Sequence, residues 1–295
     1  MQSSRSARAV GHRHDMQATY RYLRLAIILL TLLLTLSVIV QIAADDGAVL
    51  RSVSAYYYTP ARDVFVASLC AIGACMIIYR GRSDTEDVLL NLSGYLAFFV
   101  AFVPTSPAHI EAEPRSGAFI PENFITAATQ NTWAVLAAGL AGFVIEIAAL
   151  PQRERQRGSR SGIVVLVAGG VAYLGLAAYF LFARDSFFIH GHGVAAVLLF
   201  IGVVGVVGVN ATAHARCRAE DGLTRRRQWA NWYGVGFAGM LVTALVVLGP
   251  VRMLVPQWLF VLEAALIGQF LIFWIIQTVE RWHAPTIRAD ALMPG

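Results

Sequence analysis

The 295-residue chain is 57% hydrophobic and only 14% charged, about half the charged share of a soluble domain. This composition excludes a water-soluble globular fold, because there is too little polar surface to cover one. The net charge of +5 does not indicate a nucleic-acid-binding protein. The basic residues, all of them arginine, lie between apolar blocks and not along one face of a domain.

Eight apolar blocks follow one another along the chain. Each is close to the roughly 20 helical residues that cross a bilayer core of about 30 Å. We therefore expect an all-α, polytopic transmembrane bundle of about eight helices within residues 22–279, with tails at 1–21 and 280–295. The expected helices are Tyr22–Ala43, Asp63–Tyr79, Val88–Pro104, Thr132–Leu150, Gly162–Ala183, Gly193–Ala213, Ala230–Pro250 and Trp258–Val279.

The distribution of arginine predicts the orientation of the bundle. With the N-terminus inside, 18 of the 23 arginines fall in cytoplasmic segments, and the other five are Arg51, Arg62, Arg115, Arg184 and Arg252. This bias follows the positive-inside rule. We expect a multi-pass protein of a bacterial plasma membrane with both termini in the cytoplasm. The first block is longer than a signal-peptide core and lacks a clean cleavage site, so we expect a retained helix.

Sequence motifs for enzymes and cofactors do not occur in the chain. There is no nucleophile elbow, P-loop or HExxH motif. Cys70, Cys75 and Cys217 lack the spacing of metal ligands. We expect no disulfide and no resident cofactor, with zinc as the alternative. Catalysis would require a group of residues that only the fold brings together.

Glu263 is the most informative single residue. It lies five residues into the expected helix that begins at Trp258, about 8 Å below the outer hydrocarbon boundary. A carboxylate at the centre of a membrane helix costs about 2.5–3.5 kcal/mol on insertion scales. Glu263 should therefore face the protein interior and be paired or protonated. It has either a functional role or the structural role of ordering the bundle by hydrogen bonding.

Three polar residues precede or begin the second expected helix, on the same outer side as Glu263. Ser54 lies in a loop with three tyrosines, and Arg62 and Asp63 open the helix. Asp63 has a simple explanation, because a carboxylate is stabilised at a helix N-terminus. Alternatively, the three residues line an outer pocket together with Glu263 and Arg184.

Two histidines, His190 and His192, follow Arg184 between the fifth and sixth expected helices. At positions i and i+2 they cannot share a helix face, but an extended turn containing glycines would let them converge. With Asp63 and Glu263, or with His109 and Glu111, they could form a metal site. Within the helices, Asn210 and Gln269 are expected to form interhelical hydrogen bonds. His214 is expected to be solvated in the cytoplasm.

Two resemblances bear on the fold and function. The segments 52–58, 62–66 and 91–94, with Pro104 closing the next helix, resemble uncharacterised multi-pass membrane proteins of actinobacteria. More distantly, the chain is similar to the membrane hydrolases that include alkaline ceramidases and adiponectin receptors. That resemblance implies a zinc site, with Ser54, Asp63, His190 and His192 as the counterparts of its ligands. The HxxxH motif of that family's last helix is absent from Trp258–Val279.

Three functions remain open from the sequence. The first is a protein that binds or moves a lipid or small molecule through an outer-facing polar pocket. The second is a metal-dependent hydrolase that acts on a lipid within the membrane. The third is a structural or assembly partner in the cell envelope. The expected partners are the bilayer and a lipid or small-molecule ligand, with no nucleic acid and an open oligomeric state.

Overall fold

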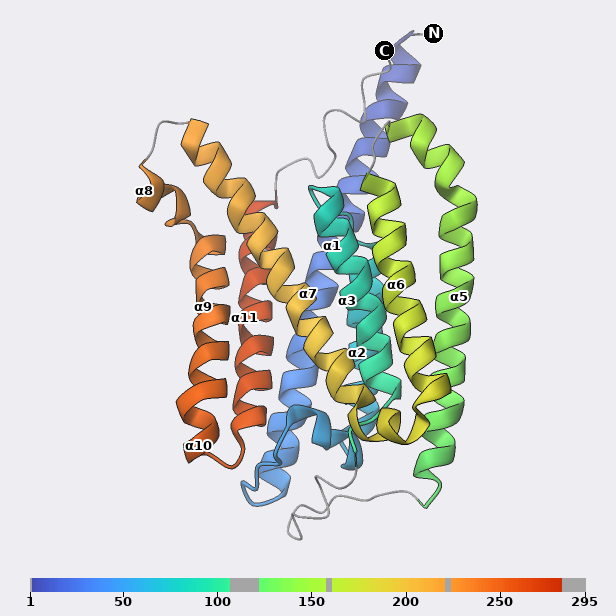
Figure 1. Cartoon of the computed structure of the whole chain (residues 1–295). Helices are drawn as coiled ribbons and strands as arrows, with labels where there is room; N and C mark the ends of the chain where they lie inside the picture. The colour runs from blue at the N-terminus through green and yellow to red at the C-terminus, as the bar shows by residue number, and fades with distance from the viewer. Residues whose placement is uncertain (1, 107–121, 158–160, 221–223, 283–295) are drawn as a thin grey trace.

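The computed structural model describes residues 2–106, 122–157, 161–220 and 224–282, and these are helical with no strand. Eight longer helices run along the bundle in this part of the chain (Figure 1). They are α1 (Gln2–Ala44), α2 (Arg62–Ile78), α3 (Asp84–Phe102), α5 (Phe124–Arg157), α6 (Ser161–Phe182), α7 (Arg184–Glu220), α9 (Trp232–Val246) and α11 (Trp258–Glu280). The shorter elements are η1 (Val53–Tyr58), α8 (Arg225–Trp229), η2 (Val247–Val251) and α10 (Arg252–Leu254).

The lengths and compositions of these helices make the chain an integral membrane protein. Within the described residues, six helices are long and apolar enough to cross a bilayer. Two more elements of the bundle are shorter: α2 has 17 residues, and the apolar part of α6 is Val167–Phe182. The predicted all-α, polytopic bundle is therefore confirmed. Its orientation in the membrane stays a prediction.

The helices α1, α2, α3, α7 and α11 form the centre of the bundle. Contacts link α1 with α2 and α11, and link α3 with α2 and α7. Helix α7 runs obliquely across the bundle, with α5 and α6 on one side and α9 on the other (Figure 1). The end of the bundle where α1 begins and α11 ends is called the arginine-rich end below. The opposite end, which contains η1, is called the loop end.

Two helices begin at capping residues that the apolar pattern does not reveal. Helix α3 begins at Asp84, four residues before the predicted start, because the Ser83 side chain accepts a hydrogen bond from the Glu86 N–H at 3.2 Å. Helix α9 begins at Trp232, where the Asn231 side chain accepts from the Gly234 N–H at 2.9 Å. Both side chains satisfy N–H groups that have no partner within the helix.

The predicted turn around His190 and His192 is wrong. Helix α7 already begins at Arg184, nine residues before the predicted start, and only Ala183 separates it from α6. Aromatic packing accounts for the extra helical turns. Phe187 is fully buried, and its ring lies edge-on to Phe99 at 5.7 Å and to Phe180 at 5.1 Å. A helical backbone keeps this side chain directed into the bundle.

The helical segment that begins with α9 bends near the loop end. The segment continues from α9 through η2 to α10, and Gly249 has non-helical backbone angles (φ −89°, ψ −106°) directly before Pro250. Proline removes a helical hydrogen bond and its ring crowds the preceding turn. The predicted end of this helix at Pro250 therefore coincides with a kink, and the helical chain continues beyond it to Leu254.

Helices α2 and α3 approach most closely at a pair of glycines. A Cβ atom placed on Gly73 would lie 2.6 Å from the Gly94 carbonyl oxygen, and a Cβ on Gly94 would lie 2.6 Å from that of Gly73. Small residues allow such close backbone packing where lipid provides no hydrophobic drive between helices. This contact holds α2 and α3 together beside the centre of the bundle.

We expect Gly73→Ala to destabilise the protein by about 1–3 kcal/mol, because the added methyl group would meet a backbone atom that cannot rotate away. Gly239→Ala in α9 is the matched control, since no heavy atom lies within 4 Å of its added Cβ. That variant should be neutral or up to about 1 kcal/mol more stable. Unfolding in an uncharged detergent measures both; equal stability of the two variants would contradict the close α2–α3 contact.

Candidate ligand-binding site

The short helix η1 folds into the loop end of the bundle between α1 and α2. All six of its residues are buried. Its N-terminus is capped by Ser52, whose hydroxyl accepts a hydrogen bond from the Ala55 N–H at 3.1 Å. Tyr58 donates its hydroxyl proton to the Thr105 carbonyl at 2.5 Å. Burial raises the pKa of Tyr58, so the hydroxyl stays protonated and keeps this donor role.

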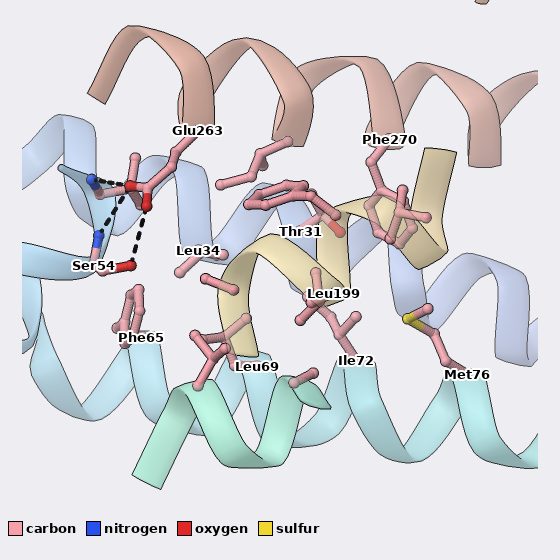
Figure 2. A pocket seen from close by; sticks show the side chains of 17 residues that line it. Thr31, Leu34, Ser54, Phe65, Leu69, Ile72, Met76, Leu199, Glu263 and Phe270 are labelled. Atoms are coloured by element: carbon pink, nitrogen blue, oxygen red, sulfur yellow. Dashed lines mark hydrogen bonds between the residues drawn. The ribbon is translucent and has the colours of Figure 1, made fainter. Parts of the chain in front are cut away.

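Glu263 joins η1 to α11. Its side chain is 8% exposed, and one carboxyl oxygen, Oε2, accepts hydrogen bonds from the Val53 N–H at 2.6 Å and the Ser54 N–H at 3.3 Å. The other oxygen, Oε1, lies 3.4 Å from the Ser54 hydroxyl (Figure 2). A carboxylate at a helix N-terminus is stabilised by the free N–H groups and by the helix dipole.

The N-terminus of α11 is satisfied in return by the same loop. The Phe260 N–H, in the first turn of α11, donates to the Arg51 carbonyl at 2.9 Å. The first N–H groups of a helix have no partner within it. Each of the two elements thus supplies the acceptor that the other one lacks, and η1 is fixed against α11.

A cavity lies next to Glu263 in the centre of the bundle. Its volume is about 80 Å³, and it is lined by residues of α1, α2, α3, α7, α11 and η1. Thr31, Ser54 and Glu263 are the polar residues of this lining. Thr31 donates to the Ile27 carbonyl of its own helix at 2.7 Å. The accessible surface of the cavity is almost entirely apolar, and Ser54 and Glu263 lie together at one end of its lining.

Figure 2 shows Glu263 and Ser54 at one end of the cavity and Met76 and Phe270 toward the other. Beyond Phe270, aromatic rings pack toward the arginine-rich end. The Phe270 ring lies 6.1 Å from that of Trp274, and the Trp274 ring lies 5.2 Å from that of Tyr79. Trp274 and Tyr79 are fully buried. Phe270 lines the cavity, and Trp274 and Tyr79 pack beyond it.

The predicted pocket residues divide into two groups. Ser54 and Glu263 lie together at the cavity, whereas Arg62, Asp63 and Arg184 do not line it. Arg62 lies over the Tyr57 ring at 4.5 Å and donates to the Tyr57 hydroxyl at 2.7 Å. Asp63 is exposed in the first turn of α2.

Arg184 begins α7 at the loop end and is exposed. Its guanidinium lies 5.0 Å from the centre of the Phe180 ring. This stacking arrangement suits an arginine at the level of the lipid headgroups. The contact orients Arg184 toward the aromatic cluster of α6 and α7 and not toward Glu263.

The two candidate zinc histidines lie on different sides of α7. Two helical residues at i and i+2 are separated by about 200° around the axis. His190 is exposed, whereas His192 is buried with Nδ1 2.6 Å from the Val103 carbonyl. Nδ1 must carry the proton there, because a carbonyl only accepts. No group of three potential metal ligands occurs within the described ranges; His109 and Glu111 lie outside them.

A second polar network lies at the arginine-rich end, where the sequence predicted interhelical hydrogen bonds for Asn210 but a solvated His214. Arg281 is 4% exposed and donates to the Tyr79 hydroxyl at 3.1 Å and to the Asn210 side-chain oxygen at 3.2 Å. Asn210 donates to Glu86 at 2.8 Å. The same carboxylate accepts from the Arg82 N–H at 2.7 Å, before the start of α3. These bonds link α2, α3, α7 and the end of α11.

The prediction that His214 is solvated is wrong. Its Nδ1 lies 2.9 Å from the Asn210 carbonyl and its Nε2 lies 2.8 Å from Glu280. Both partners are acceptors, so both bonds form together only when the ring is doubly protonated. Glu280 also accepts from the Tyr233 hydroxyl. His214 thus connects α7 to α11, and Glu280 extends the link to α9.

The predicted interhelical roles of Asn210 and Gln269 are confirmed. Asn210 bridges α7 to α3 through Glu86, as described above. Gln269 of α11 donates to the Thr243 hydroxyl of α9 at 2.7 Å. One residue of the sequence indicates the network at the arginine-rich end. Arg24 is a charged residue within the first apolar block, so it must find polar partners there. The carbonyl that accepts from it, that of Arg281, lies 257 positions away along the chain.

No protein-family model, curated protein or solved structure matches the chain. The resemblances to actinobacterial multi-pass proteins and to ceramidase-like hydrolases therefore stay predictions. The site is interpreted from its own chemistry.

We expect Glu263→Leu to lower the free energy of unfolding by about 1–3 kcal/mol, because the Val53 and Ser54 N–H groups would lose their acceptor. Ser54→Ala removes only the long hydroxyl contact and should cost less than about 1 kcal/mol. Hydrogen exchange in detergent should be faster at the η1 amides in Glu263→Leu alone. Unchanged protection of η1 in that variant would show that Glu263 does not hold it.

Proposed function

We propose that this integral membrane protein binds an amphiphile in its central cavity, with a narrow apolar body and a head that donates a hydrogen bond to Glu263. The observation that carries the proposal is an apolar cavity whose lining has Glu263 and Ser54 side by side at one end. Ligand sites are commonly apolar cavities with a few placed polar groups that orient the ligand.

The hydrogen bonds of Glu263 indicate the chemistry of the head. An ionised carboxylate has about four acceptor positions. Oε2 already accepts from two backbone N–H groups, whereas within the described residues Oε1 has only the Ser54 hydroxyl at 3.4 Å. An ammonium or hydroxyl group can donate to Oε1. A carboxylate head would instead place two acidic groups side by side, which is unfavourable.

The walls of the cavity favour a slender apolar body. Phe65 and Met76 line it from the same face of α2, and their separation in the sequence corresponds to about 16 Å along the helix. Lipid is as apolar as the cavity, so transfer of the ligand's apolar chain from the bilayer into the cavity contributes little binding free energy. Selectivity would then depend on the head group at Glu263.

Transport would require a path past the packed aromatic rings of Phe270, Trp274 and Tyr79, which lie toward the arginine-rich end. Binding requires only the cavity, whereas movement of the ligand across the bilayer requires this additional path. A zinc-dependent hydrolase remains an alternative from the sequence, as does an assembly role. The divergence of His190 and His192 gives the hydrolase no geometric support.

The test is binding of tritiated decylamine to the purified full chain, measured by scintillation proximity in an uncharged detergent. Unlabelled decanol should compete, and decanoate should compete at least tenfold less well, since one unfavourable charge contact of about 1.4 kcal/mol changes affinity tenfold. Saturable binding with this order of heads is the expected result. Absence of saturable decylamine binding, or equal competition by decanoate, would overturn the proposed head chemistry.

Two neighbouring variants of α7 locate the bound probe. Ala196 lines the cavity, so Ala196→Leu should fill it and reduce decylamine binding by roughly tenfold or more. Val197 is 60% exposed and faces away, so Val197→Leu should bind as the unchanged protein does. Thermal unfolding of both variants verifies that they are folded. Equal binding by both would place the probe outside the cavity.

A further inference from the structure

Four buried side chains at the arginine-rich end carry N–H groups without an acceptor. Arg24 is 0% exposed, and its Nη2 donates to the Arg281 carbonyl at 3.4 Å. Within the described part of the chain, its Nε and Nη1 have no partner. The same holds for Arg281 Nε, Gln277 Nε2 and Trp274 Nε1. All of these unpartnered atoms are hydrogen-bond donors.

Three of these side chains, those of Arg281, Gln277 and Trp274, contact Tyr79. The Tyr79 hydroxyl accepts from Arg281 at 3.1 Å and donates to Gln277 Oε1 at 3.4 Å. Its ring packs edge-on against Trp274 at 5.2 Å. Arg24 adjoins the group through the Arg281 backbone. Side chains from α1 and from the end of α11 therefore belong to one linked group.

Among the described residues, no carboxylate forms an ion pair with either guanidinium of this group, that of Arg24 or that of Arg281. Glu86, the buried acid of the neighbouring network, is engaged by Asn210 and by the Arg82 N–H. Buried cations are strongly unfavourable unless they are paired and hydrogen-bonded. Two such cations in one cluster require an anion.

We propose that a phosphate-type oxyanion binds between Arg24, Arg281 and Gln277. Each guanidinium presents several N–H groups in a planar fork that fits a phosphate, and the Gln277 amide adds a neutral donor. The two guanidinium groups lie at the ends of long, flexible side chains. Rotation of these side chains, without movement of a helix, therefore admits the anion. This site is separate from the cavity at Glu263.

The position of the cluster suits either of two sources of this anion. Arg24 lies six residues after the start of the apolar span at Ala18, about 9 Å along the helix, and Arg281 directly follows the end of α11. This is the level at which arginines reach lipid headgroups. The oxyanion is therefore a lipid phosphate or free inorganic phosphate.

The test measures the thermal unfolding midpoint of the purified full chain in an uncharged detergent. One arm compares sodium phosphate with sodium chloride at equal ionic strength. The other compares dihexanoyl phosphatidylglycerol with dihexanoylglycerol, which lacks the phosphate. A ligand that binds only the folded state raises the midpoint saturably. A response to inorganic phosphate identifies a free-anion site, and a response to the phospholipid alone identifies a headgroup site.

Three variants connect the response to this cluster. Arg24→Gln and Arg281→Gln should each weaken binding of whichever ligand stabilises the protein by roughly tenfold or more, because each variant removes a charged hydrogen bond. Arg21→Gln is the matched control. Arg21 lies one turn from Arg24 but stacks on the Trp282 ring at 5.5 Å, so its removal should leave the response unchanged.

Gln277→Glu keeps the test decisive if the arginine variants do not fold. The new carboxylate supplies an internal anion, so this variant should unfold at a higher temperature without ligand and lose the response to phosphate. The proposal is overturned if neither phosphate nor the phospholipid stabilises the protein beyond its control compound. It is also overturned if Arg21→Gln loses as much response as Arg24→Gln, or if Gln277→Glu retains the full response.

Discussion

The exchange of hydrogen bonds between the N-termini of η1 and α11 determines the arrangement around the central cavity. Glu263 accepts the first N–H groups of η1, and the Arg51 carbonyl accepts an N–H from the first turn of α11. Unpaired backbone groups are costly in an apolar environment. A buried loop between α1 and α2 is tolerated for this reason, and its position brings Ser54 to the cavity.

Apolar patterning predicted most of the fold, because membrane-spanning helices must satisfy their backbone within each segment. It could not predict helix starts that depend on single capping residues such as Ser83 and Asn231. It also missed the first turns of α7, where Phe187 is held by rings from α3 and α6. The α3 partner, Phe99, is distant in sequence, and a segment with two glycines and two histidines is equally compatible with a turn.

The candidate site was only partly predictable for a similar reason. A carboxylate within an apolar helix must find partners, so burial of Glu263 followed from energetics alone. The identity of those partners depended on where η1 folds. At the other end of the bundle, Arg24 and Arg281 were counted as evidence of topology, and their burial around Tyr79 depends on the meeting of α1, α2 and α11. The amino-acid sequence indicates the cost of a buried charge but not its neighbours.

The bonds that tie α1 and the adjoining η1 to α11 also have a consequence for biosynthesis. Val53 and Glu263 are separated by 210 positions, and Arg24 and Arg281 by 257. A ribosome delivers the early helices to the membrane well before α11 exists. Until then, the N–H groups of η1 have no acceptor from α11 and must remain hydrated at the membrane surface. Assembly of the central bundle is thus completed at both ends by the insertion of a single late helix.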